Sequence, residues 1–268
     1  MATFPIAKSD LIEGMAKGMA VLESFDTERQ RLNATLAAQR TGLTRAAARR
    51  HLLTLAHLGY LETDGSYFWL APKVLRFSGS YLASARLPRV LQPTLNRLAA
   101  QTQQSFSAVV LDGDEVVIVA RSGVYGAPSR SGVLSAPSRT MAYGLHLGVR
   151  LPAHPTSTGR VLLAALPAAE FTQWLKGCTL QRLTPHTLTQ VGALRKVVAQ
   201  ARLDDFCLAV EEHELGVHAL AVPLRNLQGQ TVAALNVVAS PQQMQAQTLQ
   251  RDMLPLLQEA ARELRGLL

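Results

Sequence analysis

The fold of the N-terminal part of the chain is decided by residues 32–70, which read LNATLAAQRTGLTRAAARRHLLTLAHLGYLETDGSYFWL. The stretch begins with a short helical pattern, which Asn33 is placed to cap because its side chain can accept the free N–H groups of a first turn. Gly42 interrupts the pattern where a left-handed backbone is needed, which glycine adopts without steric penalty. Thr44 is placed to cap a second, longer helix. Two helices joined by a tight glycine turn predict a helix-turn-helix motif.

A hairpin pattern follows the second helix directly. Residues 60–70 contain Asp64-Gly65, a strong signal for a tight turn, between aromatic and β-branched residues. A hairpin placed behind the second helix of a helix-turn-helix is a wing. Residues 1–75 are therefore predicted to form a winged helix-turn-helix domain.

Positive charge is concentrated in the same segment. The chain has 27 Lys and Arg against 19 Asp and Glu, a formal net charge of +8, and six arginines fall between Arg29 and Arg50 with no acidic residue among them. A solvated helix face is the ordinary explanation for such a run, but a basic helix behind a glycine turn also suits the phosphates and base edges of a major groove. We predict that double-stranded operator DNA is bound through Thr44, Arg45, Ala47, Arg49 and Arg50.

Residues 41–55, TGLTRAAARRHLLTL, followed by Leu58-Gly59-Tyr60-Leu61, resemble the IclR family of bacterial transcription factors. Within that family they are most similar to the branch that controls the degradation of aromatic acids, the Pca and Pob regulators. The resemblance extends over about residues 15–265. His51 departs from the branch, which usually has a bulky apolar residue there, and we expect a neutral, half-buried histidine rather than a DNA contact.

The rest of the chain predicts an α+β fold. Residues 76–100 predict linker helices, and the domain of residues 101–268 shows both periodicities. Strand patterns occupy residues 106–111, 115–121, 141–146, 207–211, 218–223 and 231–238, and helical patterns residues 157–166, 168–176, 191–203 and 247–267. Residues 151–164 and 211–223 resemble signature segments of the family's GAF-like effector-binding domain. In that family the linker helices help to pair subunits, which implies a homodimer or a dimer of dimers, that is, a homotetramer.

The residues expected to bind an effector gather around the start of the helix predicted at Ser157. Residues 154–158 place hydroxyl and free N–H groups at a helix N-terminus, which attracts anions, although the same residues also suit simple capping. In the resembled family this segment lines the effector pocket, opposite residues of the last strands. The expected effector-binding residues are Met141, Tyr143, His154, Thr156, Ser157, Thr158, Ala209, His218, Ala219, Asn236 and Val238. Core packing explains Met141 and Tyr143 equally well.

The resemblance also implies a function. It indicates a regulator of an operon for the degradation of aromatic compounds, controlled by an aromatic carboxylic acid or a related metabolite. The branch favours activation, which would make RNA polymerase a further partner. A repressor released by a small non-aromatic carboxylic acid and an enzyme of GAF-like fold stay open as alternatives.

Other classes of function lack their motifs. The sequence has no GxSxG, HExxH, Walker or glycine-rich dinucleotide motif, so we expect neither an enzyme nor a cofactor. His213 and His218 are five residues apart, on opposite faces of a strand, which argues against a metal site. Cys178 and Cys207 form no CxxC pair and indicate reduced thiols. Without an apolar leader or membrane-length segment, we expect a cytoplasmic protein with no membrane partner.

Two neighbouring nine-residue blocks are nearly identical. Residues 122–130 read SGVYGAPSR and residues 131–139 read SGVLSAPSR, so they agree at seven positions. A tandem duplication in a surface loop is the simplest interpretation, because long loops add little closure entropy. A lid over the ligand and an added subunit contact are the alternatives.

Overall fold

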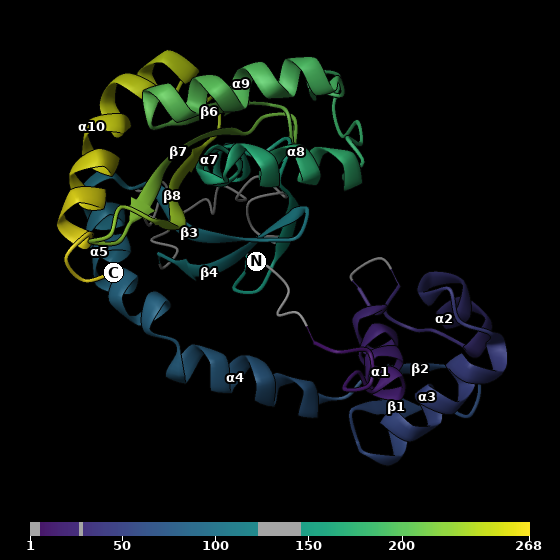
Figure 1. Cartoon of the computed structure of the whole chain (residues 1–268). Helices are drawn as coiled ribbons and strands as arrows, with labels where there is room; N and C mark the ends of the chain where they lie inside the picture. Colours follow the sequence, from purple (N-terminus) through teal and green to yellow (C-terminus); the bar gives the residue numbers. More distant parts are fainter. Residues whose placement is uncertain (1–5, 27–28, 123–145) are drawn as a thin grey trace. The chain divides into compact units, whose positions relative to one another are not determined.

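A computed structural model describes residues 6–26, 29–122 and 146–268 of the chain. The chain divides into two compact units between Ser84 and Ala85, and each unit is described by itself (Figure 1). The division falls inside the segment of residues 76–100 that the sequence predicts to link the two domains.

The N-terminal unit consists of short helices and a two-stranded antiparallel hairpin. Its elements are α1 (Glu13–Glu23), α2 (Ala34–Thr41), α3 (Arg45–His57), β1 (Leu61–Thr63), β2 (Phe68–Leu70), a 3-10 helix (Pro72–Val74) and α4 (Leu75–Ser84). Residues from α1, α2, α3 and the hairpin share one core, which includes Val21, Ala37, Ala48, Leu52 and Phe68.

The local signals that predict the helix-turn-helix are present in the structure. Asn33 caps α2, its side chain accepting the N–H of Thr35 at 3.1 Å. Gly42 ends this helix with φ of 68°, in the left-handed region. The Thr44 hydroxyl accepts the N–H of Ala47 at 3.2 Å and caps α3. Each cap involves residues two or three positions apart, which is why the sequence alone could predict them.

The predicted wing is also present. The Asp64 carboxylate accepts the N–H groups of Ser66 and Tyr67 at 3.0 and 2.8 Å, and Gly65 has φ of 93° between the paired strands β1 and β2. Aspartate commonly accepts such bonds in turns, and glycine tolerates the positive φ. The turn chemistry of this dipeptide therefore fixes the hairpin.

The C-terminal unit is built on a sheet whose described strands run in the order β5-β4-β3-β8-β7-β6, with every neighbouring pair antiparallel. Its elements in chain order are α5 (Arg86–Thr102), β3 (Ser105–Asp112), β4 (Glu115–Arg121), β5 (Arg150–Pro152), α7 (Ser157–Ala165), α8 (Ala168–Gly177), α9 (Val191–Asp204), β6 (Cys207–Val210), β7 (His218–Arg225), β8 (Thr231–Ala239) and α10 (Ala246–Leu264).

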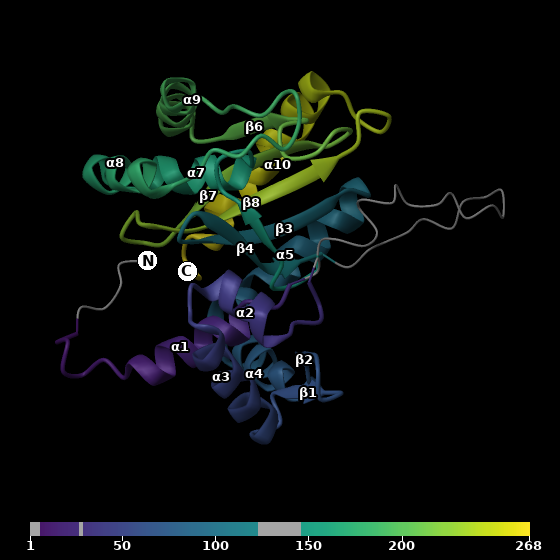
Figure 2. The ribbon, with the colours of Figure 1, turned by 90° about the vertical axis from the view of Figure 1, so that its right-hand side faces the viewer.

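Helices cover both faces of this sheet (Figures 1 and 2). One face forms a core with α5 and α10, in which Leu95 and Leu257 lie among the even-numbered residues of β7 such as Leu220. The other face forms a core with α7, α8 and α9 and includes Val109 and Ala221. None of the described helices is long and apolar enough to cross a membrane.

Some predicted elements differ from the observed ones. The linker helices predicted at residues 76–100 correspond to α4 and α5, and a 3-10 turn over Pro72–Val74 precedes α4. Of the strand predicted at residues 141–146, residues 141–145 lie outside the described part and His146 is in no strand. The sequence does not predict β5, because a three-residue strand is too short to show alternation. The duplicated blocks lie outside the described residues, apart from Ser122.

Candidate functional site

A cavity of about 190 Å³ lies between the sheet and the start of α7. Every described strand of the sheet contributes at least one residue to its lining: Ser107, Val109, Ile118, Leu151, Ala209, Ala219, Asn236 and Val238. Residues 155–158 form a second wall, and Glu212, His213, Glu214 and Val217, from the loop between β6 and β7, form a third. Most of the lining is aliphatic, with a few polar groups placed singly.

The start of α7 is deeply buried. All residues from Ser157 to Ala164 are buried, and a Cβ atom added at Gly159 would lie 2.0 Å from the carbonyl oxygen of Ala153. The loop before the helix folds onto its first turn so closely that only glycine fits at this position. This contact brings residues 155–158 to the edge of the cavity.

Some polar groups at this helix start have hydrogen-bond partners and others do not. The Thr156 hydroxyl caps α7, accepting the N–H of Gly159 at 3.1 Å. The Ser157 side chain is 1% exposed, yet its Oγ atom has no hydrogen-bond partner among the described residues. The first N–H groups of a helix also lack intrahelical acceptors. The α7 end of the cavity therefore offers hydrogen-bond donors and the positive end of a helix dipole.

A second polar group lies on the floor of the cavity. Ser107 of β3 and Asn236 of β8 are register partners, and the Ser107 hydroxyl donates to the Asn236 amide oxygen at 2.5 Å. Both residues are buried at 7% exposure and line the cavity. Since its oxygen is engaged, Asn236 retains its NH₂ group for a ligand.

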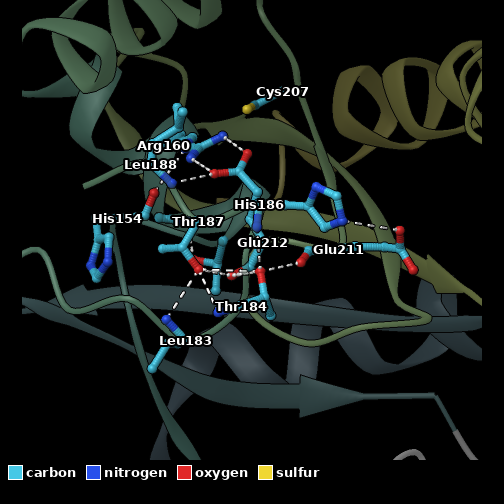
Figure 3. A network of polar contacts seen from close by, with 12 residues as sticks. His154, Arg160, Leu183, Thr184, His186, Thr187, Leu188, Cys207, Glu211 and Glu212 are labelled. Carbon is cyan, nitrogen blue, oxygen red and sulfur yellow. Dashed lines mark hydrogen bonds and ion pairs between the residues drawn. The ribbon is translucent and has the colours of Figure 1, made fainter. Parts of the chain in front are cut away.

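Behind the α7 wall lies a buried ion pair. The Arg160 guanidinium donates to both carboxylate oxygens of Glu212, at 2.6 and 2.5 Å, and to the carbonyl oxygen of His154 at 2.8 Å (Figure 3). Cys207 lies nearby in Figure 3, and burial raises its pKa to about 11. Its sulfur therefore stays a thiol at neutral pH, which does not suit a nucleophile.

The N-terminal unit presents a different kind of surface. Arg45, Arg49 and Arg50 are exposed on α3, as is the capping residue Thr44, whereas Ala47 is half-buried. Arg31 and Arg40, from the same basic run, form ion pairs with Asp64 and Asp26. No ion pair joins Arg45, Arg49 or Arg50 to another described residue, so their charge is not neutralised within the described chain.

Both units match known families. Residues 14–65 match the IclR helix-turn-helix domain, and residues 79–265 match the C-terminal domain of the bacterial transcriptional regulator IclR. The chain belongs to the IclR family. This confirms the predicted family and the predicted fold class, an N-terminal winged helix-turn-helix followed by an effector-binding α+β domain.

Relatives within the IclR family cover nearly the whole chain. The Pca operon regulatory protein of Acinetobacter baylyi is 50% identical over 263 residues, which is 98% of this chain and 91% of the relative. The p-hydroxybenzoate hydroxylase transcriptional activator of the same organism is 51% identical over 262 residues, 98% of this chain and 94% of the relative. The solved inducer-binding domain of a double mutant of Acinetobacter PobR, in complex with 3-hydroxybenzoic acid, has a TM-score of 0.60 and 46% identity, and the match covers 68% of this chain and 98% of that domain.

The structure brings most of the predicted effector-binding residues of this IclR protein together. Those that line the cavity are Thr156, Ser157, Thr158, Ala209, Ala219, Asn236 and Val238. Met141 and Tyr143 lie outside the described residues.

Two predicted residues do not line the cavity. His154 is buried with Nε2 3.0 Å from the carbonyl oxygen of Gln181, and burial lowers its pKa. His218 precedes the cavity residue Ala219 on β7 and therefore faces the α5 and α10 side, because successive strand residues point to opposite faces. Its Nδ1 atom is buried without a partner among the described residues.

Other lining residues have no signal in the local sequence. Ser107 is identifiable only through the register of β3 against β8, which places it beside Asn236. His213 and Glu214 lie in the loop after β6, where burial lowers the pKa of the histidine and raises that of the glutamate. Within the described ranges no group of three or more His, Cys, Asp or Glu residues is placed to hold a metal ion.

Proposed function

We propose that this transcriptional regulator is controlled by an aromatic monocarboxylic acid of the hydroxybenzoate class, which binds in the cavity at α7. The observation that carries this proposal is the buried Ser157 hydroxyl, which lines an apolar cavity and has no partner among the described residues. A buried polar atom normally has a hydrogen-bond partner. A bound carboxylate supplies that partner.

The cavity has the size of one substituted ring. Its volume of about 190 Å³ exceeds the roughly 150 Å³ at which an engineered apolar cavity accepts benzene. Aliphatic side chains such as Val109, Ile118 and Val238 suit a ring face, and the small Ala209 and Ala219 leave room for it.

The carboxylate must recover the hydrogen bonds that it loses on leaving water. Among the described residues no lysine or arginine lines the cavity; Arg150 is exposed and paired with Asp112 and Glu115. The Ser157 hydroxyl and the N–H groups of the first turn of α7 are the best-placed donors. Charge-assisted hydrogen bonds of this kind contribute about 1.5–3 kcal/mol each.

The relatives support a ligand that has an aromatic ring with a hydroxyl group. One is named as the activator of p-hydroxybenzoate hydroxylase, and the related PobR domain was solved with 3-hydroxybenzoic acid. In this chain the Ser107–Asn236 pair offers an acceptor and a donor on the sheet side of the cavity. A ring hydroxyl both donates and accepts, so it matches this pair.

For DNA we propose that Arg45 and Arg49 face base edges in the major groove and that Arg50 contacts phosphate. Arg45 and Arg49 lie about one turn apart on the same side of α3, and Arg50 lies about 100° further round the helix. By analogy with the named activator we propose activation through RNA polymerase, with the protein paired as a homodimer or a dimer of dimers.

Calorimetric titration of the full chain tests the effector. We expect wild type to bind 4-hydroxybenzoate more tightly than 4-hydroxybenzamide. The combined variant Ser157→Ala and Thr158→Val should lower the affinity for the acid at least about tenfold and the affinity for the amide by less. DNA affinity without ligand should not change. Thr172→Val, which removes a hydroxyl on α8 outside this cavity, is the matched control.

Two results would contradict the proposal. A double variant that binds the acid as tightly as wild type would exclude the α7 site. A wild type that binds a small aliphatic acid but none of a panel of hydroxybenzoates would favour the alternative of a non-aromatic effector.

A further inference from the structure

The charge of Arg160 has no contact with solvent. The residue is 1% exposed on α7, and each of its three guanidinium nitrogens donates a hydrogen bond, two to Glu212 and one to the carbonyl oxygen of His154. It does not line the cavity, although Ser157 one turn before it and Glu212 do. Arg160 therefore acts on the cavity only through the groups that it holds.

Glu212 is held from several directions (Figure 3). Besides the guanidinium, its carboxylate accepts the N–H of Leu188 at 3.2 Å, and its carbonyl oxygen accepts the Thr187 hydroxyl at 2.7 Å. These two partners lie in the segment between α8 and α9. Arg160 and Glu212 thus tie together three segments that are distant in the sequence: the loop before α7, this connecting segment and the loop after β6.

The sign of the charge at the cavity depends on this pair. Glu212 lines the cavity with a side chain that is only 12% exposed, so little water screens it. An unpaired carboxylate in that position would repel a second carboxylate at short range, because like charges repel more strongly in a poorly screened site. Paired with Arg160, it contributes no net charge, and the positive end of α7 dominates.

The other lining carboxylate is Glu214. No ion pair joins it to another described residue. Burial raises its pKa. Glu212 is the lining carboxylate that has a cationic partner in the described chain, Arg160.

We propose that Arg160 is a positioning residue that makes the cavity selective for acids, by neutralising Glu212 and holding the loop after β6 without touching the ligand. This inference rests on the proposed function, since it assumes that the ligand is a carboxylate. Rejection of an unwanted charge state is an established source of specificity.

A purely structural role for the pair makes a different prediction. Removing one partner of a buried ion pair is strongly destabilising, and a disordered wall would weaken every ligand alike. Charge selectivity instead changes the ratio of acid affinity to amide affinity. That ratio separates the two explanations even when the variants lose some stability.

The experiment measures this ratio by calorimetry with 4-hydroxybenzoate and 4-hydroxybenzamide on the full chain. In Arg160→Met the ratio should fall at least about tenfold, and adding Glu212→Gln should restore it to within about threefold of wild type. Glu212→Gln alone leaves Arg160 uncompensated and should raise the ratio. Arg225→Met breaks a well-aligned ion pair with Asp205 outside this cavity and should leave the ratio unchanged.

The outcomes separate the two proposals. If wild type binds neither compound, the proposed function fails and the inference fails with it. If wild type binds the acid but Arg160→Met weakens acid and amide equally, the inference alone is overturned. If Arg160→Met does not fold, Glu212→Gln decides, and an unchanged ratio in that variant overturns the inference.

Discussion

Helices α3 and α7 both begin behind a threonine whose hydroxyl accepts the N–H group three residues on: Thr44 with Ala47 at 3.2 Å, and Thr156 with Gly159 at 3.1 Å. Their surroundings differ completely. The first turn of α3 is mostly exposed, and Arg45 has no ion pair among the described residues. The first turn of α7 is buried, and the arginine that follows it is paired.

This difference explains why we propose that the same kind of helix start serves two kinds of anion. Both starts carry free N–H groups and a positive dipole end. Around α3 the exposed arginines extend this positive region over a surface, which suits a long polyanion such as DNA. Around α7 burial and the neutralised Glu212 restrict it to a cavity of about 190 Å³, which suits one small acid.

We expect the largest effect from a substitution that disrupts the close packing of the first turn of α7. Gly159→Ala places a methyl group 2.0 Å from the Ala153 carbonyl oxygen, so we expect the C-terminal unit to lose at least about 3 kcal/mol of its free energy of unfolding. The matched variant Gly42→Ala, before α3, meets no atom within 4 Å and suffers only its positive φ of 68°. It should cost the N-terminal unit about 1–2 kcal/mol.

The two tryptophans allow each unit to be followed separately. Trp69 lies in β2 and Trp174 in α8, so Trp69→Phe leaves a reporter in the C-terminal unit and Trp174→Phe one in the N-terminal unit. Urea unfolding followed by tryptophan fluorescence in these two backgrounds measures both losses. A smaller loss for Gly159→Ala than for Gly42→Ala would show that the first turn of α7 is not tightly packed.

The sequence predicted one of these helix starts better than the other. The caps and turns of the N-terminal unit join residues at most four positions apart, so their chemistry is visible locally. The Ser107–Asn236 bond spans 129 positions and the Arg160–Glu212 pair spans 52. Only the pairing of distant strands and loops brings such residues together, so neither contact could be predicted from local pattern.

Two of the expected effector-binding residues lie away from the cavity for the same reason. His218 precedes the lining residue Ala219, and the strand alternation turns it to the other face of the sheet. His154 lies in the predicted segment, yet its ring is held against Gln181 rather than at the cavity. A resemblance can assign a segment to a site, whereas the direction of each side chain depends on the folded backbone.

The next prediction tests whether the two helices bind different anions, as we propose. Arg45→Ala should weaken operator binding by about 1–3 kcal/mol and relax the preference between bases, whereas Arg50→Ala should weaken specific and random DNA alike. Neither change should affect the affinity for 4-hydroxybenzoate. Fluorescence anisotropy at several salt concentrations measures both effects, and Arg251→Ala, in the C-terminal unit, is the control. Equal losses on specific and random DNA for both variants would contradict these assignments.

The smallest expected effects come from removing the two capping hydroxyl groups, and they compare how much each cap stabilises its unit. Thr44→Val removes an exposed cap, and water can replace the lost bond to Ala47, so the N-terminal unit should lose about 1 kcal/mol. Thr156→Val removes a buried cap and leaves the Gly159 N–H without a partner away from water, so the C-terminal unit should lose about 2 kcal/mol. Serine at either position keeps the hydroxyl and should restore most of the loss. The same tryptophan fluorescence measures each unit. If Thr44→Val costs as much as Thr156→Val, burial does not distinguish the two helix starts energetically. The contrast between the exposed and the buried site that we propose must then rest on their side chains alone.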